Sequence, residues 1–226
     1  MQKKLSELVL NKPPIQKIFV IGGGASLLQQ PIHLLDEKQH FIITCNEAFT
    51  FFPNAMISHH ADYSWWQEHQ NQLNFVFKGS IKTGAGLGTN LPYPDNGIET
   101  LTMVKANNQD LLFRTPEYIY GNNCGLQALS LAHLMRPKHI ILLGFDFKIE
   151  NHQTHSYKNM PTEDLKRLQI FWAGFLKNFE EFEHFRQLQW HKVHPHLALP
   201  KVWNTNPDSA LNLYDKSKSL EELLEL

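Results

Sequence analysis

Lys17-Ile-Phe-Val-Ile-Gly-Gly-Gly-Ala-Ser26 is the stretch that decides the fold of this 226-residue chain. A short apolar run that ends in turn residues is typical of a buried strand in a parallel sheet. The apolar spacing that follows predicts a helix over residues 26–35, with Pro31 inside it. The stretch therefore predicts a strand, a glycine turn and a helix, which is the opening unit of an α/β fold.

The rest of the chain repeats this alternation. Further apolar runs predict strands at 41–45, 55–58, 74–77, 139–143 and 201–204. Apolar residues at helical spacing predict helices over 123–135 and 162–185, and a capping box at Ser219 predicts a terminal helix. Strands that alternate with helices favour a Rossmann-like, mainly parallel sheet with helices on both faces.

Length and composition predict one domain over residues 1–226. Hydrophobic residues make up 42% of the chain, which excludes global disorder. Residues 79–116 are rich in glycine and proline and break the alternation, so we expect an irregular loop or lid insertion there.

Charge and cysteine content restrict the function class. The formal net charge is -1, which argues against a general nucleic-acid binder, whose affinity comes from neutralising many phosphates. Two cysteines fit a reducing compartment better than a disulfide framework. Because no run approaches the roughly 18 apolar residues of a membrane span, we expect a cytoplasmic protein without a transmembrane segment.

The glycine turn is a candidate anion site. Gly22, Gly23 and Gly24 let the backbone approach a phosphate, and Ser26 opens the predicted helix, whose N-terminus offers free N–H groups. The dinucleotide fingerprint needs a glycine where this chain has Leu27, and the lysine of a P-loop is missing. The turn is therefore either an anion-binding turn of another kind or merely a tight turn.

Several polar residues follow predicted strands, where ligands of open parallel sheets bind. Those we assign to substrate or nucleotide contacts are Asn46, His60, Asp62, Trp65, Asp146, Asn204 and Ser209. Each has a structural alternative: a turn residue, a helix-packing ring, or, for Asp146, an anchor for nearby backbone.

Thirteen histidines invite a metal-site interpretation. His59 and His60 are adjacent on an extended chain and so point to opposite sides, and Pro195 interrupts the run His191, His194, His196. We therefore expect no metal site. His155 lies in a polar loop before a long helix and is a candidate general base, because the pKa of histidine lies near working pH.

Four segments together resemble a known family. They are Gly22-Gly-Gly-Ala-Ser-Leu27, Thr44-Cys-Asn46, Asn123-Cys-Gly125 and Gly144-Phe-Asp-Phe147. In this order they resemble the bacterial lipooligosaccharide sialyltransferases that use CMP-sialic acid. They also resemble a wider group with the same core, namely the motility accessory factor proteins, the archaeal hydroxymethyl-dihydropterin pyrophosphokinase and short phage-encoded proteins.

The resemblance implies a role for each matching position. The glycine turn with Ser26 would hold the nucleotide phosphate and ribose, Asn46 would contact the nucleotide or donor, and His155 would be the general base. Cys124 and Gly125 would contact the cytidine, and Phe147 would lie beside it. The donor would be a nucleotide sugar of the CMP type, and transfer would need no metal or other cofactor.

The expected function is thus a sialyltransferase-like glycosyltransferase that acts on an acceptor hydroxyl. The expected partners are a nucleotide or nucleotide sugar and a small-molecule or glycan acceptor, and the chain is compatible with a homo-oligomer. One alternative is a pyrophosphokinase that needs Mg²⁺, with Asp62 and Asp146 as candidate ligands and a small alcohol such as a pterin as substrate. The other is a non-catalytic module of phage origin that binds a nucleotide or a partner.

Overall fold

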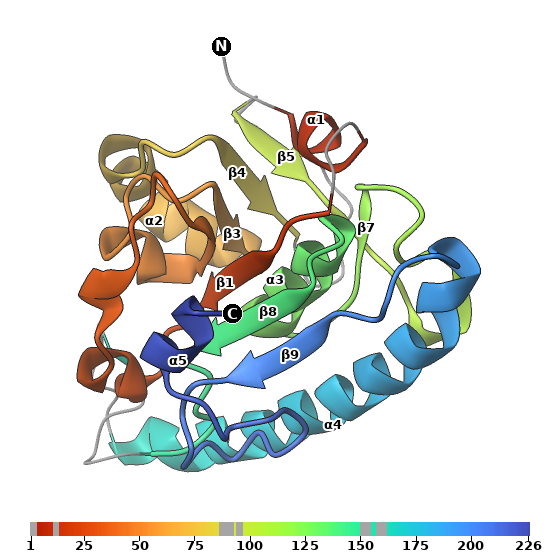
Figure 1. Ribbon diagram of the computed structural model, residues 1–226. Coiled ribbons are helices and arrows are strands. Elements are labelled where there is room, and N and C mark those ends of the chain that lie inside the picture. Colours follow the sequence, from red (N-terminus) through yellow and green to blue (C-terminus); the bar gives the residue numbers. More distant parts are fainter. Residues whose placement is uncertain (1–3, 11–13, 86–92, 94–96, 150–154, 157–161) are drawn as a thin grey trace.

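A seven-stranded sheet organises the molecule (Figure 1). The computed structural model describes residues 4–10, 14–85, 93, 97–149, 155–156 and 162–226. All neighbouring strands of the sheet are parallel. From edge to edge they are β5 (Ile98–Thr100), β4 (Ile81–Gly84), β3 (Ile57–His60), β2 (Phe41–Cys45), β1 (Lys17–Ile21), β8 (His139–Leu143) and β9 (Lys201–Asn204). The fold is the predicted α/β fold with a mostly parallel sheet.

The central strands are apolar throughout because both faces of the sheet are covered. Successive side chains of a strand point to opposite faces. In β1, Ile18 and Val20 belong to one buried core, and Phe19 and Ile21 belong to the other. This division explains why the strand shows a continuous hydrophobic run rather than an alternating pattern.

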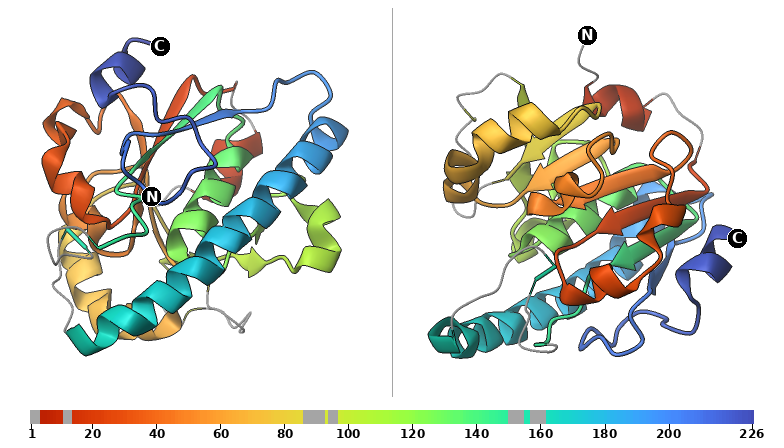
Figure 2. Two further views of the ribbon diagram at one scale, coloured as in Figure 1. Left: turned by 90° about the horizontal axis from the view of Figure 1, so that it is seen from below. Right: turned by 90° about the vertical axis from the view of Figure 1, so that its left-hand side faces the viewer.

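Helices divide between the two faces. On the first face lie α1 (Leu5–Leu10), α3 (Cys124–Leu134) and α4 (Thr162–Val193). On the second lie η1 (Ala25–Gln29), η2 (Ile32–Leu34), η3 (Asn46–Thr50), α2 (Tyr63–Val76) and α5 (Leu220–Leu224). The left panel of Figure 2 shows α3 and α4 side by side and α5 on the opposite side of the sheet. The remaining elements are η4 (Ala106–Leu111) and a small parallel pair, β6 (Thr102–Met103) and β7 (Tyr118–Ile119).

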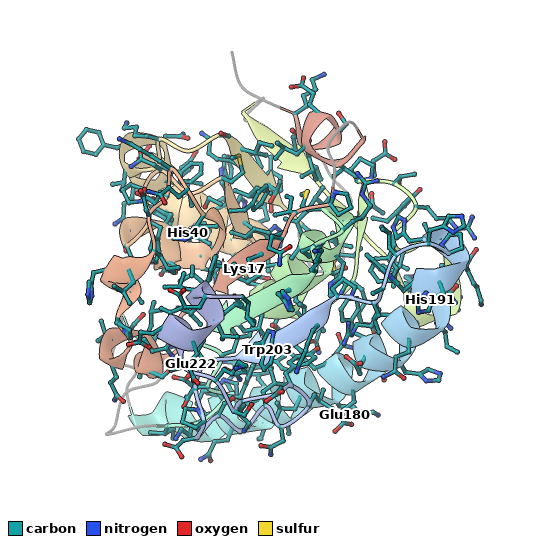
Figure 3. The ribbon with its side chains drawn as sticks, in the orientation of Figure 1. Lys17, His40, Glu180, His191, Trp203 and Glu222 are labelled. Carbon is teal, nitrogen blue, oxygen red and sulfur yellow. The ribbon has the colours of Figure 1, made fainter. Side chains whose placement is uncertain are left out.

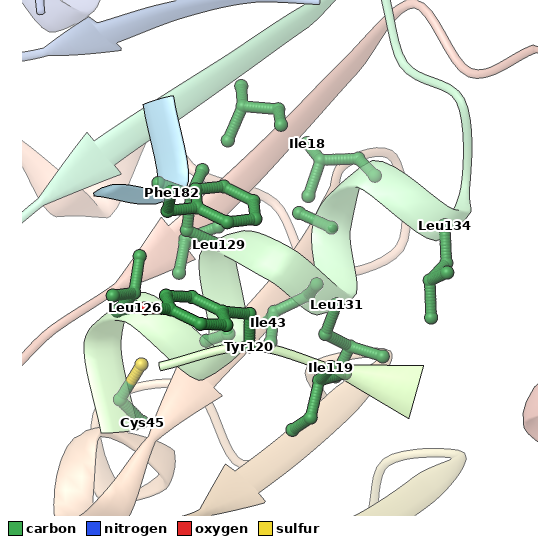
Figure 4. Close-up of a cluster of buried hydrophobic side chains, with 14 of the residues drawn as sticks. Ile18, Ile43, Cys45, Ile119, Tyr120, Leu126, Leu129, Leu131, Leu134 and Phe182 are labelled. Carbon is green, nitrogen blue, oxygen red and sulfur yellow. The ribbon is translucent and has the colours of Figure 1, made fainter. Parts of the chain in front are cut away.

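Helix α3 is the centre of the first core (Figure 4). Its apolar residues are fully or almost fully buried, and Leu126 and Leu129 belong to one cluster with sheet residues and Phe182 of α4. The Asn123 side chain caps the helix by accepting a hydrogen bond from the N–H of Leu126 at 3.0 Å. The predicted start of this helix is thereby explained.

Some predicted elements differ from the structure. Residues 26–35 form two short 3₁₀ helices rather than one helix, and residues 74–76 end α2 rather than forming a strand. Phe75 is 80% exposed, whereas Leu73, two residues before it, is fully buried. Residues two apart share a face in a strand but not in a helix, so this difference is typical of a helix. Strand β3 begins two residues later than predicted and includes His59 and His60. The stretch from 79 to 116 supplies two strands of the main sheet, β4 and β5.

The strand order creates one special place in the sheet. The chain runs outward from β1 to β5 and then returns through α3 to place β8 on the other side of β1. The carboxyl ends of β1 and β8 therefore lie where the winding direction reverses, and open α/β sheets bind ligands at this point. No helix in the described part of the chain has the length and apolar character needed to cross a membrane.

Candidate functional site

A cleft of about 160 Å³ lies at the carboxyl ends of β1, β2 and β8. In Figure 1 the arrowheads of β1 and β8 point toward the end at which α4 begins. Four separate segments and one side of α4 line the cleft: Gly22–Gly24, Cys45 and Asn46, Asn123–Gly125, Gly144–Phe147, and Trp172 with Phe175; His155 completes the lining. The cleft thus occupies the switch point of the sheet, and it brings together most of the predicted nucleotide contacts.

The glycine turn is held tightly against the end of β8. The N–H of Gly22 donates to the carbonyl of Leu143 at 2.7 Å, and the N–H of Gly24 donates to the carbonyl of Gly144 at 2.8 Å. A Cβ atom on Gly24 would lie 2.5 Å from the Asp146 carboxyl carbon and 2.7 Å from the Gly144 oxygen. Glycine is therefore required for close packing, and two of the turn amides are already used within the protein.

Asp146 is the anchor of this turn. Its carboxylate accepts hydrogen bonds from the N–H and the hydroxyl of Ser26, at 2.8 and 2.5 Å, and from the amide of Asn206 at 2.8 Å. Asp146 is 2% exposed, and Ser26 is also buried. Asp146 was interpreted as either a substrate contact or an anchor for nearby backbone, and these contacts match the anchor. The Ser26 hydroxyl, which was expected to contact a ligand, donates its hydrogen bond to Asp146 instead.

Asn204 and Ser209 stand behind the cleft rather than in it. The Asn204 amide donates to the carbonyl of Phe145 at 3.3 Å, and the Ser209 hydroxyl donates to the same carbonyl at 2.5 Å. Both side chains are buried, and neither lines the cleft. They fix the backbone that carries Asp146, so in this structure they support the site from outside.

Two lining residues have unusual backbone conformations. Asn46 has a φ of 49° and Phe147 a φ of 51°, in the left-handed region that is uncommon for residues other than glycine. Such conformations gather at functional sites, where the surrounding structure holds them. Among the described residues, none donates a hydrogen bond to the buried side-chain oxygen of Asn46. It is therefore an acceptor available to a ligand.

The N-terminus of α3 faces the cleft. Asn123, Cys124 and Gly125 line it, and the first N–H groups of a helix carry partial positive charge. Helix η1, by contrast, is a five-residue 3₁₀ helix whose early amide at Ser26 is bound by Asp146. The anion-attracting helix end at this site is thus that of α3, and not the one expected after the glycine turn.

Two thiols lie on the floor of the cleft. The Cys124 thiol donates to the carbonyl of His59 at 3.4 Å, and Cys45 Sγ lies 3.9 Å from the carbonyl oxygen of Cys124. Burial raises the pKa of Cys124 well above its usual value, and the neighbouring Cys45 raises it further. Cys124 therefore remains a neutral thiol, which suits contact with a ligand and not nucleophilic attack.

His155 reaches the cleft beside the glycine turn. The N–H of the next residue, Ser156, donates to the carbonyl of Gly23 at 2.8 Å, and the Ser156 hydroxyl lies 3.4 Å from the same oxygen. These bonds join the loop of the candidate base to the turn. Thr154, the other neighbour of His155, lies outside the described residues.

An aromatic wall, which was not predicted from the sequence, lines one side of the cleft. Trp172 and Phe175 are among the residues whose helical spacing predicts the helix over 162–185. Trp172 is nearly buried, and both side chains line the cleft. The signal in the sequence is the run of aromatic residues on this helix. Its spacing matches ordinary core packing, and so it does not indicate the site.

His60, Asp62 and Trp65 lie at the same edge of the sheet but do not line the cleft. His60 is fully buried at the end of β3, and its ring stacks on Trp65 with centroids 5.3 Å apart. The Trp65 indole N–H donates to Glu47 at 2.9 Å. Asp62 precedes α2 and is half-buried, and burial raises the pKa of its carboxyl group.

Among the described residues, no group of three or more histidine, cysteine or acidic side chains is arranged to hold a metal ion. The run that contains His191 lies at the end of α4, far from the strand tips (Figure 3). His59 instead bonds to Thr83 and Gln127, each at 3.0 Å, inside the core.

Comparisons with known proteins bear on the fold of this chain. No protein-family model matches the chain, and no curated protein matches it. Among solved structures, the fold is similar to that of the sialyltransferase CstII from Campylobacter jejuni, determined in complex with a substrate analogue, cytidine-5'-monophosphate. The likeness has a TM-score of 0.50 and covers 92% of this chain and 87% of that chain, at 14% sequence identity. At this identity the likeness shows the fold alone: this chain has a Rossmann-like α/β fold.

Proposed function

We propose that the protein is a glycosyltransferase that binds a CMP-type nucleotide sugar in the cleft and transfers the sugar to an acceptor hydroxyl. The observation that carries the proposal is the meeting of three features at the switch point. A glycine turn, the N-terminus of α3 and His155 all face one cleft. The fold likeness to a sialyltransferase that was solved with cytidine-5'-monophosphate supports the same ligand class.

The donor phosphate lies, in this proposal, between the start of α3 and the glycine turn. The N–H groups of Cys124 and Gly125 belong to the first turn of the helix, where anions bind favourably. Gly23 faces the cleft. The N–H groups of its neighbours, Gly22 and Gly24, already donate hydrogen bonds to carbonyl groups of the protein. The buried oxygen of Asn46 accepts from a hydroxyl or amino group of the donor, and Trp172 offers an aromatic face to the base or sugar.

His155 acts on the acceptor. Its ring takes the proton of the acceptor hydroxyl while the hydroxyl oxygen forms a bond to the anomeric carbon of the donor sugar. The bond between that carbon and the phosphate oxygen breaks, and CMP leaves with the electron pair. The helix end stabilises the negative charge that develops on the phosphate. A positioned general base contributes roughly 10²- to 10⁴-fold to such a step.

The pyrophosphokinase alternative needs carboxylates to hold Mg²⁺ against the phosphates. Asp146, one of its two candidate ligands, already accepts three hydrogen bonds from Ser26 and Asn206. Asp62, the other candidate, lies outside the cleft lining. These positions favour the transferase.

The proposal is tested with two measurements on the purified protein. Calorimetry with CMP, UDP, GDP and ATP, each with Mg²⁺ and with EDTA, should give binding of CMP in both conditions. Turnover of a CMP-sugar, followed by NMR, should fall by at least about 100-fold in His155→Ala. The matched control is His191→Ala, an exposed histidine on α4, which should leave turnover unchanged. Full turnover in His155→Ala would exclude the proposed base, and activity that EDTA abolishes would favour the kinase.

A further inference from the structure

Five aromatic rings pack together where β3 ends and α2 begins, next to the cleft. We call this group the aromatic cluster; it consists of His60, Tyr63, Trp65, Trp66 and Tyr93. The centroids of His60 and Tyr93 are 5.0 Å apart, and those of Trp66 and Tyr93 are 5.6 Å apart. The cleft as described above does not use these rings.

The inner rings of the cluster carry polar atoms without partners. In the described part of the chain, nothing bonds to either ring nitrogen of His60, to the indole N–H of Trp66 or to the hydroxyl of Tyr93. His60 is fully buried, and Trp66 and Tyr93 are 5% and 6% exposed. Buried polar groups nearly always have partners, so an unpaired set at one place indicates a bound molecule that supplies them.

The outer side of the cluster is open to solvent and carries an acid. Tyr63 is 40% exposed, and its ring lies 5.3 Å from Trp66 and 5.7 Å from Tyr93. Asp62 is the residue directly before Tyr63 of the cluster. Burial raises the pKa of Tyr93 most, and the charge of Asp62 raises it further. Asp62 precedes α2 without capping it with its side chain. The carboxylate therefore lies at the start of α2, beside the cluster, and makes no capping hydrogen bond to that helix.

We propose that the aromatic cluster and Asp62 form the acceptor subsite, and that this subsite binds a neutral sugar ring. The inference rests on the proposed transferase function, because a transferase needs an acceptor beside its donor. Sugar hydroxyls both donate and accept hydrogen bonds, which matches the donor of Trp66, the acceptor nitrogen of His60 and the carboxylate of Asp62. The apolar face of a sugar packs on an aromatic ring, and the carboxylate disfavours an anionic ligand. In this proposal the exposed Tyr63 ring, which covers Trp66 and Tyr93, moves aside when the sugar binds.

The test uses methyl glycosides of glucose, galactose, mannose and N-acetylglucosamine as probes, with saturation-transfer NMR on the full chain. We expect at least one glycoside to show saturation transfer from the protein, which reports binding, both without nucleotide and with CMP. Its affinity should fall about tenfold in Asp62→Asn, which removes a charged acceptor, and about fivefold in Trp66→Phe, which removes one N–H and keeps the ring. The affinity for CMP should stay the same in both variants.

Phe75→Ala is the matched control, because Phe75 is an exposed aromatic residue at the other end of the same helix. This variant should bind glycosides like the unmodified protein, and thermal melting should confirm that all three variants are folded. Three results would overturn the subsite. The first is that no glycoside receives saturation, and the second is that Asp62→Asn and Trp66→Phe bind glycosides as tightly as the unmodified protein. The third is that the cation tetramethylammonium binds there and glycosides do not. Failure of CMP to bind would instead remove the proposed function, and the glycoside measurement without nucleotide separates the two results.

Discussion

Replacing Asp146 by alanine should destabilise the protein strongly because the carboxylate anchors the glycine turn. The variant leaves three buried donors without an acceptor: the N–H and the hydroxyl of Ser26 and the amide of Asn206. An unsatisfied buried group costs about 1–3 kcal/mol. Water entering from the cleft partners some of these groups, so we expect a loss of about 3–5 kcal/mol. That is a large part of the roughly 5–15 kcal/mol that stabilises a typical domain.

Urea unfolding followed by tryptophan fluorescence measures this loss, with Asp208→Ala as the control. Asp208 is a nearby exposed aspartate, and its variant should change stability by less than about 0.5 kcal/mol. The Asp146 variant should also lose CMP affinity, because the turn that borders the cleft loosens. If Asp146→Ala keeps full stability and loses only turnover, Asp146 is a substrate contact, and the anchoring role assigned here is wrong.

Three further predictions follow from the same structure. Gly24→Ala places a methyl group 2.5 Å from the anchoring carboxyl group and should cost about 2 kcal/mol in urea unfolding; an unchanged midpoint would contradict the close packing. Burial lowers the pKa values of His59, His60 and His133 to about 4, about 3 and about 3. Below pH 6.5 these histidines are protonated in the unfolded chain but stay neutral in the folded chain. The free energy of unfolding should therefore fall between pH 7 and pH 5 by about 2 kcal/mol for each histidine. Equal free energies of unfolding at pH 7 and pH 5 would show that these rings are not buried. Ser219→Ala removes the capping box of α5 and should cost about 1 kcal/mol, measured by thermal melting; no change would mean that this helix contributes little.

The sequence predicts those parts of the fold where a local pattern has one interpretation. The runs at 17–21, 41–45 and 139–143 are strands with the expected bounds. The segment 74–77 is too short for its pattern to separate strand from helix, and packing of Leu73 against the second core decides the outcome. Residues 26–35 do not form one regular helix, because Pro31 separates the two short 3₁₀ helices.

The sequence predicts those residues of the candidate site that directly follow strands. It does not predict the residues whose role is set by contacts between distant segments of the chain. Glycines and Asn46 follow strands, and parallel strands bring their carboxyl ends to one edge. The use of Ser26, Asn204 and Ser209 as supports depends on the position of Asp146 and Phe145 in space, which no spacing in the sequence reveals. The role of α3 as the helix facing the cleft likewise depends on the order of the strands.

We propose that the cleft at the switch point holds the nucleotide of a sugar donor. Isothermal titration of the protein with CMP, repeated with Gly125→Ala, measures whether it does. Gly125 lies in the first turn of α3, and a Cβ atom on it would lie 2.8 Å from the Phe145 ring. This variant therefore disturbs the proposed phosphate position. We expect CMP to bind the unmodified protein in the presence of EDTA and to bind Gly125→Ala at least about tenfold more weakly. No heat of binding with the unmodified protein, or equal affinity in the two proteins, would contradict it.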